Sequence, residues 1–389
     1  MYTFTPKFRT MKKHLIIFVL FCTVGSLQAQ KPTVWNRVNN LLTKPANVDS
    51  TRVYQPTAGF SLGVFSTLQK SGFDVNADFR IDDYMDGLPL EGVSNYSLSE
   101  KLCKKVGLEV DYGNFGFGYS LEVGPRSANK RSGIGFSYMG KSFGARINYY
   151  KITNPFVTGL TVGNEGDDNF FHYDFSPDEE ATLKSLSIDG YYVFNNKRFA
   201  YPAAYKRGLV QRRTTGSWLL TARYMQGDLY NSPEAAWDTY NMVDCFTTMQ
   251  ASVGGGYSVN FVPWHRDPTG PRDAGLRNLT INLTAMPVLT AFNYLKTISY
   301  EYDDAGNKTG ETIAKAYCYP MPNYIGSAAV SMTFGRIYFS AQFTYNTFYF
   351  RSNNAFNAKH LELPDYVDYL SYRGNFHDWL LKGLLVYSF

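Results

Sequence analysis

Residues 337–350 alternate regularly between apolar and polar side chains. The apolar positions at period two are Ile337, Phe339, Ala341, Phe343 and Tyr345, and Ser, Gln, Thr and Asn residues stand between them. This period indicates a β-strand with one apolar and one polar face. At about 3.3 Å per residue the segment is roughly 46 Å long, enough to cross a bilayer core even when tilted.

Twelve further segments show the same alternation. They are 60–64, 75–81, 105–112, 117–123, 134–138, 145–149, 186–194, 218–224, 253–261, 279–285, 328–334 and 379–389. The pattern predicts an all-β, antiparallel transmembrane β-barrel. Bacterial barrels have an even number of strands, so one of the thirteen assignments must be wrong. We expect twelve strands, with fourteen as the alternative, and expect the error at 195–216 or 260–277, which are long for periplasmic turns.

Charged residues occupy the polar faces of these segments. Examples are Asp78, Arg80, Glu109, Arg146, Asp189 and Arg223. An arginine on a lipid face costs about 2–4 kcal/mol at the bilayer midplane, so we expect these side chains to face the lumen. Pairs between such charges across the barrel would close it, and the sequence does not decide between an open and a plugged lumen. A soluble β-sandwich with a wet outer face is the alternative.

Short turns and long connections alternate along the chain. If Phe389 ends in the periplasm, the turns at 335–336 and 140–142 fall on the periplasmic side. The long connections 82–103, 152–184, 227–248, 289–325 and 351–377 then fall outside the cell. Short inner turns and longer outer loops are typical of outer-membrane barrels.

A signal peptide precedes the alternating segments. It starts at Met11 with Lys12 and Lys13, continues through an apolar stretch and ends near Ala29, after which we expect cleavage. Residues 1–10 are interpreted as an upstream extension. The predicted organisation is therefore 1–29 as extension plus signal peptide, 30–56 as a periplasmic segment and 57–389 as the barrel. The predicted location is the bacterial outer membrane.

The last strand ends on Tyr387-Ser388-Phe389, which resembles the assembly signal of outer-membrane barrels. Gly383 lies one residue out of the usual register for that signal. From the aromatic C-terminus we expect the barrel assembly machinery to bind this strand. We also expect lipid and lipopolysaccharide to surround the barrel.

Composition narrows the range of functions. The formal net charge is +5, but four basic residues lie in the leader, so the remainder is nearly neutral and predicts no nucleic-acid partner. The three cysteines outside the leader, Cys103, Cys245 and Cys318, do not make a disulfide framework. We expect them to be unpaired, with a single pair as the alternative.

Two strings in the hairpin region match catalytic motifs. Residues 135–142 match the P-loop pattern, and residues 140–144 match the nucleophile elbow. Both motifs require a helix after the loop, whereas a second strand is expected here. Ser142 with His360 or His377 is retained only as a weak hydrolase hypothesis.

Two charged stretches are candidate binding regions. The acidic stretch 163–180 would suit Ca²⁺ or a divalent bridge to lipopolysaccharide, but it lacks the EF-hand spacing. The basic stretch 196–213 would meet anionic phosphates or line a mouth of the barrel. Solvated loops are favoured for both. We assign no catalytic, cofactor or metal residues and do not expect an enzyme.

The stretch from Tyr191 to Tyr205, with Asn195-Asn-Lys-Arg-Phe and Ala203-Ala204, resembles the Bacteroidetes DUF4421 family. Gln211 to Trp218 and Gly133 to Lys151 resemble it too, and the likeness covers roughly 48–389. Thr214-Thr215 replaces the Ser-Ala expected in the family. The resemblance implies a secreted protein of uncharacterised function with an outer-membrane barrel, and it supplies no catalytic or binding residues.

The expected function is a structural or scaffolding role, or passive passage of small solutes. A barrel whose outer loops bind a ligand or a surface partner is the alternative, and an outer-membrane hydrolase is the less favoured third.

Overall fold

The structure is a computed structural model of the chain, which divides into two units, Met1–Lys44 and Pro45–Phe389. It describes residues 47–56, 59–85, 88–99, 102–123, 130–153, 157–163, 171–173, 182–230, 245–302, 308–352 and 367–389. All of these residues belong to the second unit. The predicted leader lies outside the described residues.

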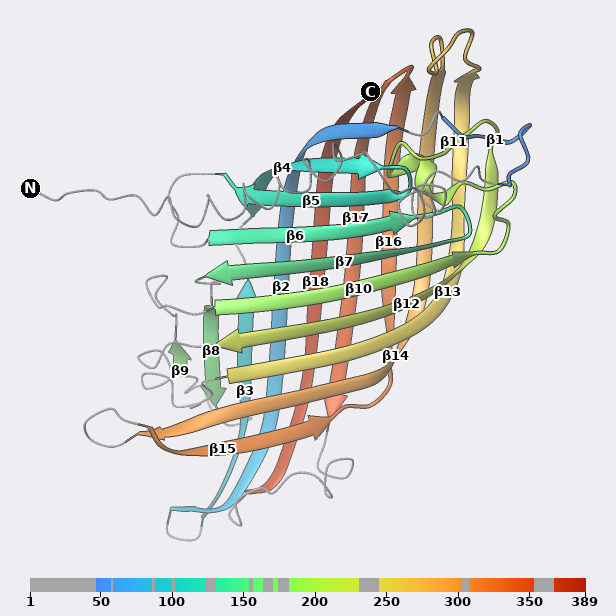
Figure 1. The fold of residues 1–389 in the computed structure, drawn as a ribbon. Helices are drawn as coiled ribbons and strands as arrows, with labels where there is room; N and C mark the ends of the chain where they lie inside the picture. The colour runs from blue at the N-terminus through green and yellow to red at the C-terminus, as the bar shows by residue number, and fades with distance from the viewer. Residues whose placement is uncertain are drawn as a thin grey trace, which may run out of the picture. The chain divides into compact units, whose positions relative to one another are not determined.

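Twelve antiparallel strands of the second unit form a closed ring. They are β2 (Phe60–Met85), β4 (Cys103–Tyr112), β5 (Phe115–Glu122), β6 (Lys130–Met139), β7 (Phe143–Thr153), β10 (Thr182–Val193), β12 (Thr215–Tyr230), β13 (Cys245–Arg266), β14 (Arg277–Tyr302), β16 (Met321–Phe334), β17 (Ile337–Ser352) and β18 (Val367–Ser388). The ring closes because β18 pairs with β2 over almost its whole length (Figure 1). The predicted fold class, a twelve-stranded antiparallel barrel, is confirmed.

The surplus thirteenth segment lies at the start of the barrel. Segments 60–64 and 75–81 both belong to β2, which is 26 residues long. The apolar positions are even-numbered in the first segment and odd-numbered in the second, so one strand reads as two. The expectation that the error lies at 195–216 or 260–277 was wrong.

Short strands extend the sheet beyond the ring. β3 (Leu88–Ser99) pairs with β2, β8 (Val157–Gly163) with β3, and β9 (Phe171–Tyr173) with β8. β15 (Lys308–Tyr317) pairs with the part of β14 beyond residue 293. The long connections thus contain strand pairing that the alternation pattern did not predict.

Short turns gather at one end of the ring, which we call the turn end. β4–β5, β6–β7 and β16–β17 are joined there, as are two longer connections, 194–214 and 267–276. The five long connections predicted to lie outside the cell leave from the opposite end. Gly113 and Gly335 have φ of 57° and 58° in two of these turns. This left-handed conformation suits glycine, and tight hairpin turns require it. Which end faces the periplasm remains a prediction.

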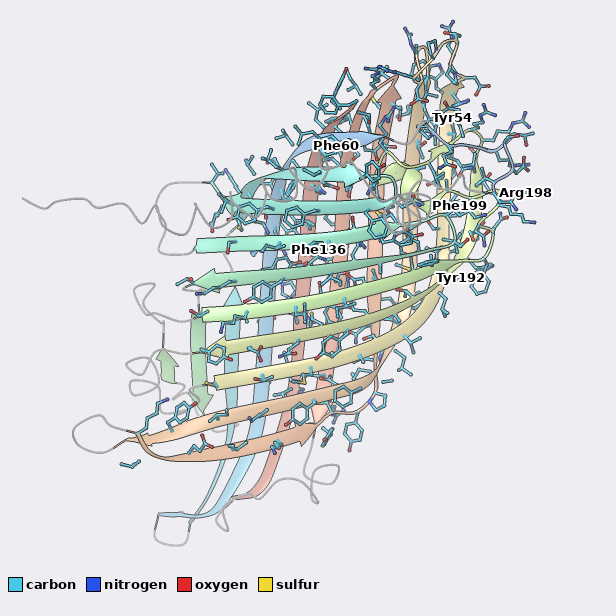
Figure 2. All side chains as sticks on the ribbon, in the orientation of Figure 1. Tyr54, Phe60, Phe136, Tyr192, Arg198 and Phe199 are labelled. Atoms are coloured by element: carbon cyan, nitrogen blue, oxygen red, sulfur yellow. The ribbon has the colours of Figure 1, made fainter. Side chains whose placement is uncertain are left out.

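Apolar side chains cover the outer face of the ring. Phe136 and Leu108 are 55% and 56% exposed, and the predicted apolar face of β17, including Ile337 and Phe339, also points outward. Figure 2 shows Phe60, Phe136 and Tyr192 on the strands. Among the described residues, no helix is long and apolar enough to cross a membrane.

Aromatic rings are concentrated on the outer face at the turn end. Ring pairs with centroids 4.9–6.3 Å apart are Phe60–Phe389, Phe115–Tyr138, Tyr138–Phe143, Tyr192–Phe194, Trp218–Tyr257, Trp264–Phe334 and Tyr387–Phe389. Such a belt is typical of the level where a barrel meets the lipid headgroups.

Candidate functional site

The connection between β10 and β12, residues 194–214, folds into the barrel instead of lying in solvent. We call it the plug. It contains a single 3₁₀ turn, η1 (Tyr201–Ala204), and a two-residue strand, β11 (Val210–Gln211). Its fully or almost fully buried members are Phe199, Ala200, Tyr201, Ala203, Ala204, Tyr205, Lys206, Leu209, Val210 and Gln211.

The local sequence of the plug explains its compact turn. Pro202 stands at the start of η1, where a fixed φ and a missing N–H are tolerated. The backbone N–H groups of Tyr205 and Lys206 both donate to the Pro202 carbonyl at 2.9 Å. The Tyr201 ring lies 4.7 Å from Tyr191 on β10 and 5.1 Å from Tyr205. These contacts hold an aromatic cluster against the inner wall.

Polar side chains of the inner wall hold the plug by hydrogen bonds. The Tyr205 hydroxyl donates to Asn282 Oδ1 on β14 at 2.6 Å, and Gln342 Nε2 on β17 donates to the Tyr205 carbonyl at 3.0 Å. Ser331 on β16 donates to the Ala203 carbonyl at 3.1 Å. Because buried polar groups are costly when unpaired, each bond favours the inserted position over an outward one.

Two cations of the plug reach buried carboxylates from other parts of the chain. Lys206 Nζ lies 2.8 Å from Asp111 Oδ1 on β4, with both side chains at most 7% exposed. Arg207 lies 2.8 Å from Asp273 Oδ2 in the β13–β14 connection, and both side chains are at most 4% exposed. Arg207 also donates to Ser388 Oγ on β18 at 2.7 Å. The plug is thereby tied to opposite sides of the ring.

A glycine makes room for one of these pairs. A Cβ on Gly116 of β5 would lie 2.5 Å from Asp111 Oδ1 and 3.2 Å from Lys206 Nζ. Any side chain there would displace the ion pair. Gly118, two residues further along the same face, has its nearest neighbour at an ordinary 3.7 Å.

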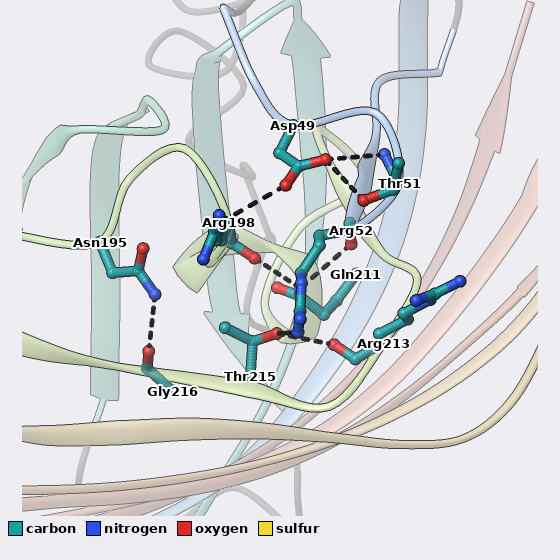
Figure 3. Close-up of polar contacts among 9 residues, drawn as sticks. All are labelled: Asp49, Thr51, Arg52, Asn195, Arg198, Gln211, Arg213, Thr215 and Gly216. Carbon is teal, nitrogen blue, oxygen red and sulfur yellow. Dashed lines mark hydrogen bonds and ion pairs between the residues drawn. The ribbon is translucent and has the colours of Figure 1, made fainter.

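The segment before the barrel clasps the plug from the turn end. β1 (Val53–Tyr54) pairs antiparallel with β11, and Gln211 Nε2 donates to the Arg52 and Arg198 carbonyls at 3.1 and 2.8 Å (Figure 3). Residues 47–56, expected as part of a separate periplasmic segment, thus pack with the barrel unit. Burial and the hydrogen bond that Tyr54 donates to Asp273 raise the pKa of Tyr54 to about 12.

Asp49 supports this clasp at its exposed edge. Its carboxylate accepts hydrogen bonds from the Thr51 hydroxyl at 2.6 Å and the Thr51 N–H at 3.0 Å, and lies 3.5 Å from Arg198 Nε. The hydroxyl, then the amide and then the Arg198 charge lower the pKa of Asp49 below its ordinary value of 3.8. The carboxylate is therefore charged at neutral pH and fixes the 47–54 turn against the plug.

A cavity of about 340 Å³ lies in the lumen against the inner side of the plug. Tyr201, Tyr205 and Lys206 of the plug line it, together with residues from all twelve strands. The volume falls in the range of small-molecule sites, roughly 300–1,000 Å³. We call this space the lumen cavity.

Charged side chains of the wall point into the lumen, as predicted for Glu109 and Arg223, and form ion pairs there. Lys382 Nζ is 2.6 Å from Glu109 Oε2, and Arg223 forms an ion pair with Asp189. Arg223 also donates to Asn346 on β17 at 3.0 Å, four strands away around the ring. The side chains of Asp78 and Arg80 lie outside the described residues.

Ser142 and His377, two of the residues singled out for chemistry, are not brought together. Ser142 lies in the β6–β7 turn at the turn end, and β7, not a helix, follows it. His377 pairs with Gly72, twelve residues along β2 from Phe60, or about 40 Å of strand. His360 and nearly all of the acidic stretch 163–180 lie outside the described side chains, so both calls remain predictions.

No metal site appears among the described residues, which contain no cluster of three or more His, Cys, Asp or Glu suited to an ion. Cys103, Cys245 and Cys318 are each buried, and none of them forms a disulfide bond. His265 is held by Asp267 at 2.9 Å and Asn278 at 3.2 Å.

The basic stretch 196–213 was predicted as a solvated charged loop and is instead mostly the plug. Lys206 and Arg207 carry no sign of burial in the sequence, because a buried cation is recognised only by its partner. Those partners, Asp111 and Asp273, lie far away in the chain. The sequence feature that indicated burial was the apolar run 199–205, because a solvated turn does not require apolar side chains.

Residues 69–373 match the family model "Domain of unknown function (DUF4421)", and the chain belongs to this family. No curated protein matches the chain.

Among solved structures, the outer-membrane protease OmpT of Escherichia coli is similar at 9% identity, covering 87% of this chain and 100% of that one, with a TM-score of 0.36. The translocator domain of the autotransporter NalP of Neisseria meningitidis has 13% identity, coverages of 91% and 93%, and a TM-score of 0.31. A Pseudomonas aeruginosa FadL homologue has 11% identity, coverages of 86% and 91%, and a TM-score of 0.25. Scores this low carry no inference about the activity of this chain.

Proposed function

We propose that this protein is an integral β-barrel of a bacterial outer membrane, exported by a leader cleaved near Ala29, whose lumen the plug closes at the turn end. Two features of the outer face support the membrane location: apolar side chains cover it, and an aromatic belt surrounds one end. Closed antiparallel rings satisfy every backbone hydrogen bond without water, which is the requirement for crossing hydrocarbon.

The plug favours a structural role over passive passage of solutes. Its contacts reach β4, β10, β13, β14, β16, β17 and β18. Two buried ion pairs and several hydrogen bonds must break before it leaves. The observation that carries the proposal is the insertion of Tyr205, Lys206 and Arg207 into the lumen, where they contact the inner wall of the ring.

The test is ion conductance of the refolded protein in a planar bilayer, after heat-modifiable gel migration has shown that the barrel is folded. The intact protein is expected to be silent. A variant with residues 199–209 replaced by a Gly-Ser linker is expected to conduct in steps. Arg213→Ala, which changes an exposed side chain of the plug, is the matched control and should stay silent.

Steady conductance of the intact protein would reject a closed barrel and restore the passive-passage hypothesis. Purification from the periplasm without detergent would reject the membrane location itself. Ligand binding by the outer loops remains a separate prediction, because the acidic stretch that motivates it is not described.

A further inference from the structure

We propose that the lumen cavity binds a small zwitterionic solute, a short peptide with free termini, with its carboxylate at Arg146 and its ammonium group at Asp378. This deepens the proposed function, since a plug that closes one end turns the lumen into a pocket.

Arg146 supplies a cation that the protein leaves without an ion pair. It lines the lumen cavity from β7 and stands opposite Asp189 in the β7–β10 register. Asp189 forms an ion pair with Arg223 and also attracts Arg146 electrostatically, so these three groups together keep one excess positive charge. Within the described part of the chain, no hydrogen bond or ion pair involves the Arg146 guanidinium. Planar guanidinium groups bind carboxylates through two parallel hydrogen bonds, so this group suits a peptide C-terminus.

Asp378 supplies the complementary anion. It lines the same cavity from β18 and accepts hydrogen bonds only from neutral donors, Gln69 Nε2 at 2.8 Å and Ser71 Oγ at 2.9 Å. Lys105 bonds to the other end of Gln69 at 2.9 Å. Within the described residues no cation forms an ion pair with Asp378, so one face of its carboxylate is left for an ammonium group.

The two groups line the lumen cavity from strands that are far apart around the ring. Going around the ring, β18 and β7 are separated by five steps of twelve. Of the other charged residues that line the cavity, Lys382 pairs with Glu109, Lys206 with Asp111 and Arg223 with Asp189, and Lys105 donates to Gln69. The remaining cation and carboxylate thus match the two ends of one zwitterion.

The wall between them offers further contacts for a peptide. Thr67 Oγ1 and Gln250 Oε1 are buried and have no hydrogen-bond partner among the described residues, and both side chains line the cavity. Unpaired buried polar atoms of this kind mark places where a ligand or water completes the bonding. Phe348 and Phe376, with ring centroids 5.9 Å apart, add an apolar surface for side chains.

The experiment is calorimetric titration of the refolded, detergent-solubilised full chain with di-, tri- and tetra-alanine. Each peptide is compared with its N-acetylated and its C-amidated form. Affinity should peak at one length, because both ends are fixed, and each cap alone should weaken binding by about tenfold or more. Capping leaves the protein unchanged, so folding cannot explain the loss.

Two variants repeat the test from the protein side. Arg146→Gln should abolish the effect of C-amidation, and Asp378→Asn should abolish that of N-acetylation. Lys184→Gln and Asp228→Asn, which change charge outside the cavity lining, are the controls and should bind like the unchanged chain.

No binding by any of the peptides, or equal binding of free and capped forms, would overturn the proposal. Loss from one cap only would also overturn the two-ended site. None of these results touches the closed barrel, which conductance and heat-modifiable migration test separately.

Discussion

Arg207 in the β10–β12 connection and Asp273 in the β13–β14 connection form a buried ion pair, 2.8 Å between Nη2 and Oδ2, across 66 residues of chain. Tyr54, from the segment before the barrel, donates to the same carboxylate at 2.6 Å. Three separate parts of the sequence therefore meet at one carboxylate, and this meeting holds the plug at the turn end.

Removing the charge of Asp273 should release the plug. Asp273→Asn leaves the Arg207 guanidinium buried without a counter-ion, and breaking a buried pair in this way costs about 3–5 kcal/mol. Asparagine tolerates the positive φ of 64° at this position, so the backbone is not strained. We expect a lower free energy of unfolding in urea and the appearance of bilayer conductance. Glu311→Gln, at an exposed carboxylate of β15, is the control.

Filling the space at Gly116 should have a similar effect through Lys206. Gly116→Ala places a methyl group 2.5 Å from Asp111 Oδ1, so the Lys206–Asp111 pair must shift. Gly118→Ala adds the same methyl group two residues away, where the nearest atom is at 3.7 Å. We expect faster proteolysis within 194–214 for Gly116→Ala only. Equal protease sensitivity of the two variants would contradict the role given to this glycine.

Arginine substitutions on the outer face should reveal the depth of the bilayer. Leu283, on the outward face of β14 and six residues from its start at the turn end, is 49% exposed. Leu283→Arg should destabilise folding into a membrane by about 2–4 kcal/mol, and Phe334→Arg at the aromatic belt by only about 0–1 kcal/mol. Unfolding titrations in lipid vesicles measure both. In a soluble protein the two exposed positions would differ little.

Acid should loosen the clasp at Asp49. The folded state lowers the pKa of this carboxyl, so its contribution to stability is present above the unfolded pKa and disappears as pH falls through the folded pKa, below 3.8. Amide exchange of residues 51–54 should be slow and constant from pH 5 to 7, after correction for intrinsic rates, and increase below about pH 4. Thr51→Val removes the hydroxyl hydrogen bond, which is the largest cause of the lowered pKa of Asp49, and should therefore move this transition to higher pH. Ser50→Ala serves as the control.

The alternation of side chains was enough to predict the barrel wall. Ile337 and Phe339 point outward, as the period required. Glu109 and Arg223 point inward, where they form ion pairs with Lys382 and Asp189, respectively. The alternation pattern wrongly divided β2 into two strands, because its apolar positions change from even to odd numbers along its length. The change comes where β2 stops pairing with β4 and begins to pair with β3, at residue 72. A period of two detects a strand only while one face keeps the same environment.

The candidate site could not be predicted in this way. Lys206 and Arg207 belong to a basic stretch whose composition indicates a solvated loop, and Arg146 and Asp378 stand on different strands far apart in the chain. Local sequence shows which residues carry charge. It does not show which charges find a partner, since that depends on contacts between distant segments.

Strand period, outward apolar faces and the position of the turns are local properties, and the residues of each strand specify them without reference to the rest of the chain. The insertion of 194–214 is different. It depends on Asp111, Asp273 and Asn282 offering partners inside a ring that exists only when β18 pairs with β2. Closure of the ring is therefore what places the plug, the lumen cavity and the unpaired Arg146 and Asp378 in one space.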